Sequence, residues 1–197
     1  MQTIIHAWQT PGSFAALATL PRQEMPHDWY GNDVEPSLEY AMAADEENLW
    51  FLAARKAGAA IHPDARPGAF QPELWKYDVA EFFIGSTEGT NYWEFNLCLN
   101  GAWWACAFET ARKADTALTA PEGVETQGTL TETDWQCMAR IPLAALKGID
   151  LRHCKIAVTS ILNTPDQIFL TTADNLEGEP DFHRPGDWAM PILVPAN

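Results

Sequence analysis

The feature of this sequence that most constrains its fold is the dipeptide Asn100-Gly101, which stands between two runs of alternating residues. Asn-Gly readily adopts the positive φ angles of a type I′ turn, and between alternating runs it is the strongest short-range indication of a β-hairpin. A two-residue turn sets the pairing of the strands, so Cys98 is expected to face Trp103. The sequence therefore predicts an antiparallel hairpin over residues 92–109.

Period-two alternation gives this predicted hairpin one apolar face and one mixed face. The apolar face, which we expect in a core, carries Trp93, Phe95, Leu97, Leu99, Ala102, Trp104, Cys106 and Phe108. The mixed face carries Tyr92, Glu94, Asn96, Cys98, Trp103, Ala105, Ala107 and Glu109. Rings beside carboxylate and amide groups occur on ordinary wet sheet faces and on platforms for polar ligands with apolar patches, such as sugars. Both interpretations stay open at this stage.

The rest of the chain consists of short β-like runs separated by turn residues. Strands are predicted at residues 3–8, 37–43, 49–55, 76–84, 135–141, 155–162, 167–172 and 190–194, long loops at 21–36 and 62–72, and a helical turn at 142–147. About nine strands and little helix predict an all-β fold, an antiparallel β-sandwich of jelly-roll type. In the strand 76–84, Glu81 shares a face with Val79 and Phe83. A length of 197 residues suits a single domain over residues 1–197.

The strongly acidic composition bears on the choice of partner. Twelve Lys and Arg against 27 Asp and Glu give a net charge of −15, which repels phosphate backbones and anionic membranes. We therefore expect neither nucleic acid nor a membrane as a partner, and the sequence indicates nothing about protein partners. The N-terminus has no basic region before its apolar residues, and no apolar run approaches the ~20 residues of a membrane helix. A cytoplasmic location is expected for the chain as given.

Neither the cysteines nor the histidines form a recognisable catalytic or metal motif. The four Cys residues include no CxxC pair and are predicted to be buried free thiols. GxSxG, HExxH, P-loop and GxGxxG motifs are absent, and the five His residues are scattered. We therefore predict that the protein is not an enzyme. The alternative is a glycoside-acting enzyme, because Glu81 and Glu94 can share a sheet face and paired carboxylates perform glycoside hydrolysis.

Four segments resemble the family 9 carbohydrate-binding modules and the wider DOMON-like group. They are Leu74-Trp-Lys-Tyr-Asp-Val-Ala-Glu-Phe-Phe-Ile84, Tyr92-Trp-Glu-Phe-Asn96, the strand Trp135–Leu143 that ends in Ile-Pro-Leu, and Pro180-Asp-Phe-His183. The resemblance covers about residues 37–195. It implies a single DOMON-like β-sandwich domain that binds carbohydrate, or another small polar ligand, on one face.

In the carbohydrate-binding members of that group, two Trp rings clamp a sugar while carboxylates and amides hold its hydroxyl groups. The resemblance implies that Trp75 is one of these rings and that Glu81 binds hydroxyls. The alternative is structural: Trp75 would anchor a strand, and Glu81 would neutralise Arg55 or Arg140. No second Trp is present at residues 162–176, where Phe169 is the one aromatic residue.

Glu94, Asn96 and Trp103 complete the predicted ligand-binding set, because they lie on the mixed face of the hairpin. The physical basis is that sugar C–H faces stack on aromatic rings, while hydroxyls form charge-assisted hydrogen bonds to carboxylates. Asp181 and His183 lie in a Pro- and Gly-rich segment and are expected to close the fold.

No cofactor is predicted. Some DOMON relatives bind haem through axial His, Met or Lys side chains, and Met42, Met138 and His183 are candidates, but no spacing supports them. A structural calcium ion is the open alternative, since carbohydrate-binding sandwiches often carry one and the loops hold Asp28, Asp33, Asp45 and Asp64. Loop aspartates of this kind are usually just solvated. The function predicted from the sequence is therefore non-catalytic carbohydrate binding, with haem binding and glycoside chemistry as alternatives.

Overall fold

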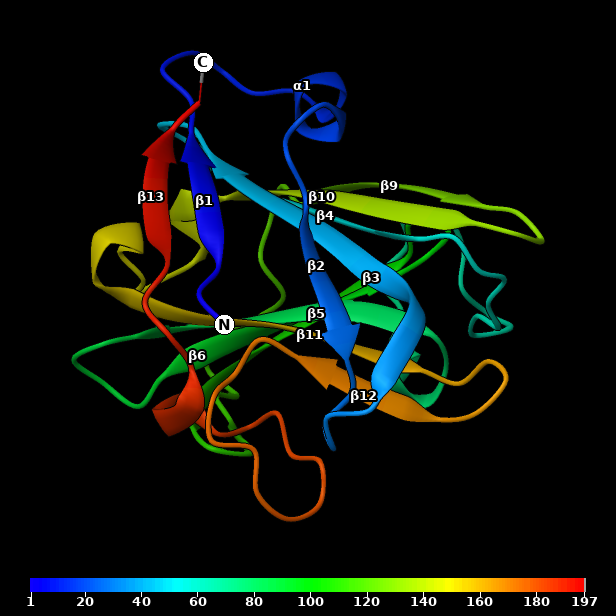
Figure 1. Cartoon of the computed structure of the whole chain (residues 1–197). Helices are drawn as coiled ribbons and strands as arrows, with labels where there is room; N and C mark the ends of the chain where they lie inside the picture. The colour runs from blue at the N-terminus through cyan, green and yellow to red at the C-terminus, as the bar shows by residue number, and fades with distance from the viewer. Residues whose placement is uncertain (197) are drawn as a thin grey trace.

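The computed structural model describes residues 1–196, whose strands form two sheets packed against each other (Figure 1). The first sheet has the strand order β13-β1-β3-β4-β10-β9, and β2 pairs with β3 at its side. Its strands are β1 (Ile4–Ala7), β2 (Gln23–His27), β3 (Asp33–Ala44), β4 (Asn48–Arg55), β9 (Glu125–Leu130), β10 (Trp135–Pro142) and β13 (Ile192–Pro195). β1 runs parallel to β3 and to β13, and the other pairings in this sheet are antiparallel.

The second sheet is wholly antiparallel and has the order β12-β11-β5-β6-β7-β8. Its strands are β5 (Val79–Ser86), β6 (Tyr92–Cys98), β7 (Trp103–Thr110), β8 (Lys113–Ala114), β11 (Cys154–Leu162) and β12 (Ile168–Thr171). The helical content is one short α-helix and four 3₁₀ turns: α1 (Phe14–Ala18), η1 (Leu74–Lys76), η2 (Leu143–Ala145), η3 (Leu151–His153) and η4 (Pro185–Asp187).

The predicted all-β sandwich is confirmed, with thirteen strands in the described residues where about nine were expected. Part of the difference lies in residues 21–36, where the prediction of a long loop is wrong. This segment contains β2 and the start of β3. Pro26 and Pro36 hide the strand signal there, since proline is tolerated in strands mainly at edges and irregularities, and the β2–β3 register shifts between Met25 and His27.

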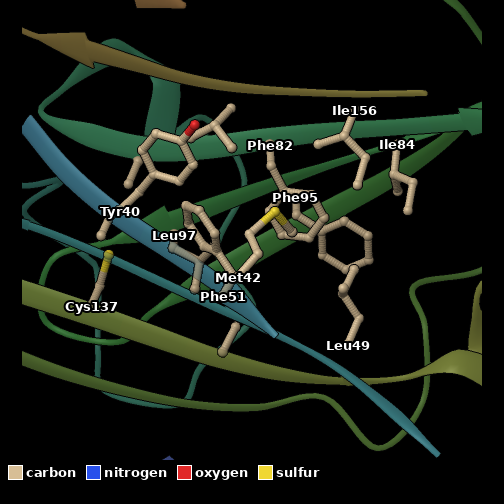
Figure 2. Close-up of a cluster of buried hydrophobic side chains, with 14 of the residues drawn as sticks. Tyr40, Met42, Leu49, Phe51, Phe82, Ile84, Phe95, Leu97, Cys137 and Ile156 are labelled. Carbon is tan, nitrogen blue, oxygen red and sulfur yellow. The ribbon is translucent and has the colours of Figure 1, made fainter. Parts of the chain in front are cut away.

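The core between the sheets is built by inward-facing side chains of both sheets, part of which Figure 2 shows. The rings of Phe82 and Phe95 stack with centroids 4.9 Å apart, and Phe51 from the first sheet meets Phe82 at 5.1 Å. The side chains of β5 alternate as predicted: Phe82 belongs to this core, whereas Phe83 belongs to a separate cluster on the outer face. Every residue of β6 is nonetheless buried, so the outer face of this sheet is covered as well.

The hairpin of β6 and β7 is present, but its turn is one residue longer than predicted. The Cys98 backbone N–H donates to the Ala102 carbonyl at 2.8 Å, and Leu97 lies opposite Trp103. Residues 99–101 therefore form a three-residue loop, and Gly101 at φ +93° takes the left-handed position that closes such loops. The predicted two-residue type I′ turn is wrong.

This slip of one residue places every side chain of β7 on the opposite face from the prediction. Trp103, Ala105 and Ala107 belong to the core or pack against it, while Trp104 and Phe108 lie on the outer face. The prediction that Trp103 shares the mixed face is therefore wrong. The inward space is already filled by rings such as Phe82 and Phe95, so small alanines fit there better than larger side chains.

The four cysteines are free thiols, as predicted, and Cys106 is half-buried while the other three are buried. The register places Cys98 and Cys106 on the same outer face, contrary to the expectation that they lie on opposite faces.

Candidate functional site

The outer face of the second sheet carries a pocket of about 500 Å³, a volume typical of small-ligand sites. Its floor comes from the sheet, and its rim comes from η1, from the turn after β7 and from the chain between β12 and β13. Figure 1 shows this last segment, in orange to red, beneath the second sheet on the side away from the first. The lining residues are Trp75, Glu81, Phe83, Glu94, Trp104, Phe108, Arg112, Ile161, Phe169, Pro180, Asp181, Phe182 and His183.

A row of polar side chains crosses the floor at one register position. Thr159 on β11 lies opposite Glu81 on β5, and Glu81 lies opposite Asn96 on β6. The Thr159 hydroxyl donates to the Glu81 carboxylate at 3.1 Å. Glu94 precedes Asn96 by two residues, so the carboxylates of Glu81 and Glu94 are diagonal neighbours on one face of the sheet.

Both carboxylates are buried, with 2 % of Glu81 and 6 % of Glu94 exposed. Burial raises the pKa of Glu81 well above its usual value, and the nearby charge of Glu94 raises it further. Burial also raises the pKa of Glu94 to about 7, although the Asn96 amide and Arg112 partly oppose the effect. Among the described residues, no Lys or Arg side chain forms an ion pair with either carboxylate.

His183 lies between Tyr92, with which it shares a hydrogen bond, and the carboxylate of Glu94. The Arg112 backbone N–H donates to the Tyr92 hydroxyl at 3.1 Å, and that hydroxyl lies 2.7 Å from His183 Nδ1. Burial raises the pKa of Tyr92 to about 12 and lowers that of His183 to about 4, so at neutral pH a protonated tyrosine meets a neutral imidazole. The other ring nitrogen of His183, Nε2, lies 3.6 Å from Glu94 Oε2.

Asn96 is fully buried between these groups, and neither its Oδ1 nor its Nδ2 has a hydrogen-bond partner among the described residues. Buried amides are normally satisfied, and leaving one unpaired costs about 1–3 kcal/mol. Because Asn96 lies between Glu81 and Trp104 in register, its side chain is on the pocket face.

Aromatic side chains form the walls. Trp75 is half-exposed at η1, where Lys76 Nζ lies 5.5 Å from its ring centroid. Phe169 and Phe182 meet at 6.2 Å, and Trp104 completes the lining from β7. Sequence reasoning missed Trp104, because the predicted turn put it in the core. The signal was present in the pair Trp103-Trp104, one of which had to lie on each face.

Four of the residues predicted to bind ligand line this single pocket: Trp75, Glu81, Glu94 and Phe169. Asn96 lies in the floor row, and Trp103 lies on the other side of the sheet. Asp181 and His183, expected only to close the fold, line the pocket too.

Glu81 pairs with neither of the two arginines that the structural alternative assigned to it. Arg140 pairs with Glu125 at 2.8 Å, and Arg55 Nε donates to the Pro36 carbonyl at 2.9 Å. Arg112, which the sequence did not single out, lies at the rim and pairs with Asp181 at 2.7 Å.

Residues 1–196 contain no group of three or more His, Cys, Asp or Glu side chains arranged to hold a metal ion. Two of the loop aspartates considered for calcium instead hold turns. Asp45 accepts hydrogen bonds from the backbones of Gly12, Glu47 and Asn48, and Asp28 accepts from Tyr30 and Asn32. Within residues 1–196, no helix has the length and apolar character needed to cross a membrane.

No protein-family model matches the chain, and no curated protein sequence matches it. Solved structures with a similar fold do exist. A "putative carbohydrate-binding protein" from Bacteroides uniformis superposes with a TM-score of 0.74 at 12 % identity, over 96 % of this chain and 97 % of that one.

Two structures of a family 9 carbohydrate-binding module from Caldicellulosiruptor kristjanssonii are also similar. The complex with glucose gives a TM-score of 0.66 at 11 % identity, over 100 % of this chain and 97 % of that one. The complex with cellotriose gives 0.65 at 10 % identity, over 100 % and 95 %. The chain therefore has a fold like that of the family 9 carbohydrate-binding modules, as its motifs implied.

Proposed function

We propose that this protein binds carbohydrate in the pocket on the outer face of its second sheet, without altering it chemically. The observation that carries the proposal is the burial of Glu81, Glu94 and an unpartnered Asn96 beneath aromatic walls. Sugars present apolar C–H faces that stack on rings, and vicinal hydroxyls that donate to carboxylates. The similar modules bound to glucose and cellotriose support a ligand of this class.

The alternative function, a glycoside-acting enzyme, rests on Glu81 and Glu94 as a pair of carboxylates on one face of the sheet. The glycosidase alternative predicts turnover of chromogenic glycosides that is lost in Glu81→Gln, and such a result would favour the enzyme over the binding protein.

Replacing Trp75 by alanine is expected to weaken sugar binding at least about tenfold, because the ligand loses the surface of one aromatic wall. The side chain is half-exposed, so the substitution should leave folding intact. Isothermal titration calorimetry with hexoses, pentoses, hexosamines and short β-linked oligosaccharides measures the effect.

Phe70→Ala is the matched control for Trp75→Ala. Phe70 is 45 % exposed against 50 % for Trp75, and it packs on Trp103, away from the pocket. The Phe70→Ala variant should bind sugar with the affinity of the wild type. A wild-type protein that binds no sugar of the panel, or a Trp75→Ala variant of unchanged affinity, would contradict the proposal.

A further inference from the structure

The floor of the pocket holds two carboxylates and no balancing cation. Arg112, the nearest guanidinium at the rim, is 62 % exposed and already pairs with Asp181. His183 shares a hydrogen bond with Tyr92 at Nδ1, and burial lowers the pKa of His183 to about 4, so it is neutral at pH 7. Two ionised carboxylates on one buried face repel each other, and burying them without a positive partner is costly.

The same floor offers acceptors that match the donors of one ammonium group. Carboxylate oxygens of the pocket-lining Glu81 and Glu94 are two of them, and the third is the unpartnered Oδ1 of the buried Asn96, which lies between Glu81 and Trp104 in register. An ammonium group carries three N–H donors and a full positive charge. A single hydroxyl group carries one donor and no charge, so it would leave two of these acceptors without a donor. The unpartnered Asn96 Nδ2 needs an acceptor, which a neighbouring hydroxyl of the same sugar can supply.

The walls also suit a cation. Phe83 lies opposite Glu94 in register, Trp104 lies opposite Asn96, and Phe108 completes the pocket side of β7. Aromatic ring faces attract ammonium groups, most strongly where water is excluded. The net charge of −15 attracts cations to the protein from a distance as well.

We propose that the ligand is an amino sugar with a free, protonated amino group, which lies between Glu81, Glu94 and Asn96. The inference rests on the proposed carbohydrate-binding function and narrows it to one class of sugar. In the bound state the ammonium group takes the place of a proton that the two carboxylates would otherwise retain, so it offsets one of their two negative charges.

Calorimetric titration at pH 7 with three probes of one ring shape tests this inference: D-glucosamine, D-glucose and N-acetyl-D-glucosamine, with D-galactosamine and D-mannosamine as further free amines. At least one free amine should bind ten times more tightly than its hydroxyl and N-acetyl counterparts. The N-acetyl sugar keeps a substituent at the same carbon without charge, so it separates charge from shape. If glucose binds as tightly as every amine, this inference is overturned while the proposed function stands. If no sugar binds, both are overturned.

The Glu94→Gln variant locates the selectivity in the pocket floor. It keeps the shape of the side chain and removes one charge, so the ratio of the amine affinity to the hydroxyl affinity should fall below about threefold, whatever the affinity for glucose itself becomes. Glu125→Gln removes the same charge from an exposed position on β9 and should keep the full preference. A preference for the amine that survives in Glu94→Gln would show that Glu94 does not recognise the ammonium group. A preference that is lost equally in Glu125→Gln would assign the effect to the overall charge of the protein. Either result overturns the proposed site.

Discussion

Glu94→Gln is expected to stabilise the free protein at pH 8 and to have little effect near pH 5. The folded protein raises the pKa of Glu94 from the usual 4.5 to about 7 by burial, so ionising this group at pH 8 opposes folding. The rise corresponds to about 3 kcal/mol of unfolding free energy. Glutamine never ionises and is free of this penalty.

The sign follows from proton binding. Between pH 4.5 and 7, folded Glu94 holds more protons than unfolded Glu94, so its contribution to stability is fully present below pH 4.5 and is lost as the pH rises through 7. His183 acts in the opposite direction, because its pKa is lowered to about 4 and its contribution is lost as the pH falls below 6.5. His183 is present in both the wild type and Glu94→Gln, so its contribution cancels in the difference between their free energies of unfolding.

Urea or thermal unfolding of the wild type and Glu94→Gln at pH 5, 6, 7 and 8 measures this difference. Glu125→Gln serves as the control, because its carboxylate is exposed and its ion pair with Arg140 lies on the first sheet. The control should show no pH-dependent gain. A difference between Glu94→Gln and wild type that is constant across this pH range would show that Glu94 is not held in a strongly desolvated position.

Gly128→Ala is expected to destabilise the protein by about 3 kcal/mol, because a methyl group there would overlap the backbone of the hairpin turn. A Cβ atom at residue 128 would lie 2.3 Å from Asn100 C and 2.3 Å from Gly101 N. Backbone atoms cannot rotate away as a side chain can. Either β9 must shift from β10 or the turn must leave its place, and both changes disturb the buried core around Leu99.

Gly186→Ala is the matched control for this substitution. Gly186 has no heavy atom within 4 Å of a built Cβ and no positive φ angle, so the change should alter the free energy of unfolding by less than about 1 kcal/mol. Denaturant unfolding of both variants checks the comparison. Equal stability of Gly128→Ala and wild type would mean that the turn does not dock against β9 as described.

Part of the candidate site followed from the sequence. Alternation along each strand indicated that Glu81 and Glu94 can share a face, and the register of β5 and β6 shows that they do. Trp75 followed from its position six residues before Glu81 in a segment similar to a known family. These residues do line one pocket.

The rest of the site depended on distances that no local pattern encodes. Asn-Gly is compatible with a two-residue turn and with a three-residue loop that ends in a left-handed glycine, and the choice decides whether Trp103 or Trp104 faces the pocket. Phe182 and His183 reach the site from a loop that two tryptophans hold in place. Trp29 Nε1, far away in the sequence, donates to the Gly178 carbonyl, and Trp188 Nε1 donates to the Phe182 carbonyl.

The sequence by itself determined the all-β class and the hairpin at Asn100-Gly101, because each depends on the alternation and turn preferences of neighbouring residues. Only the tertiary structure decided the register between strands: that of β5 and β6, which puts the two carboxylates on one face, and that of β7, which puts the second tryptophan in the pocket. The physical reason is packing, because the small Ala105 and Ala107 face the core beside its aromatic rings and the turn lies against the backbone of Gly128.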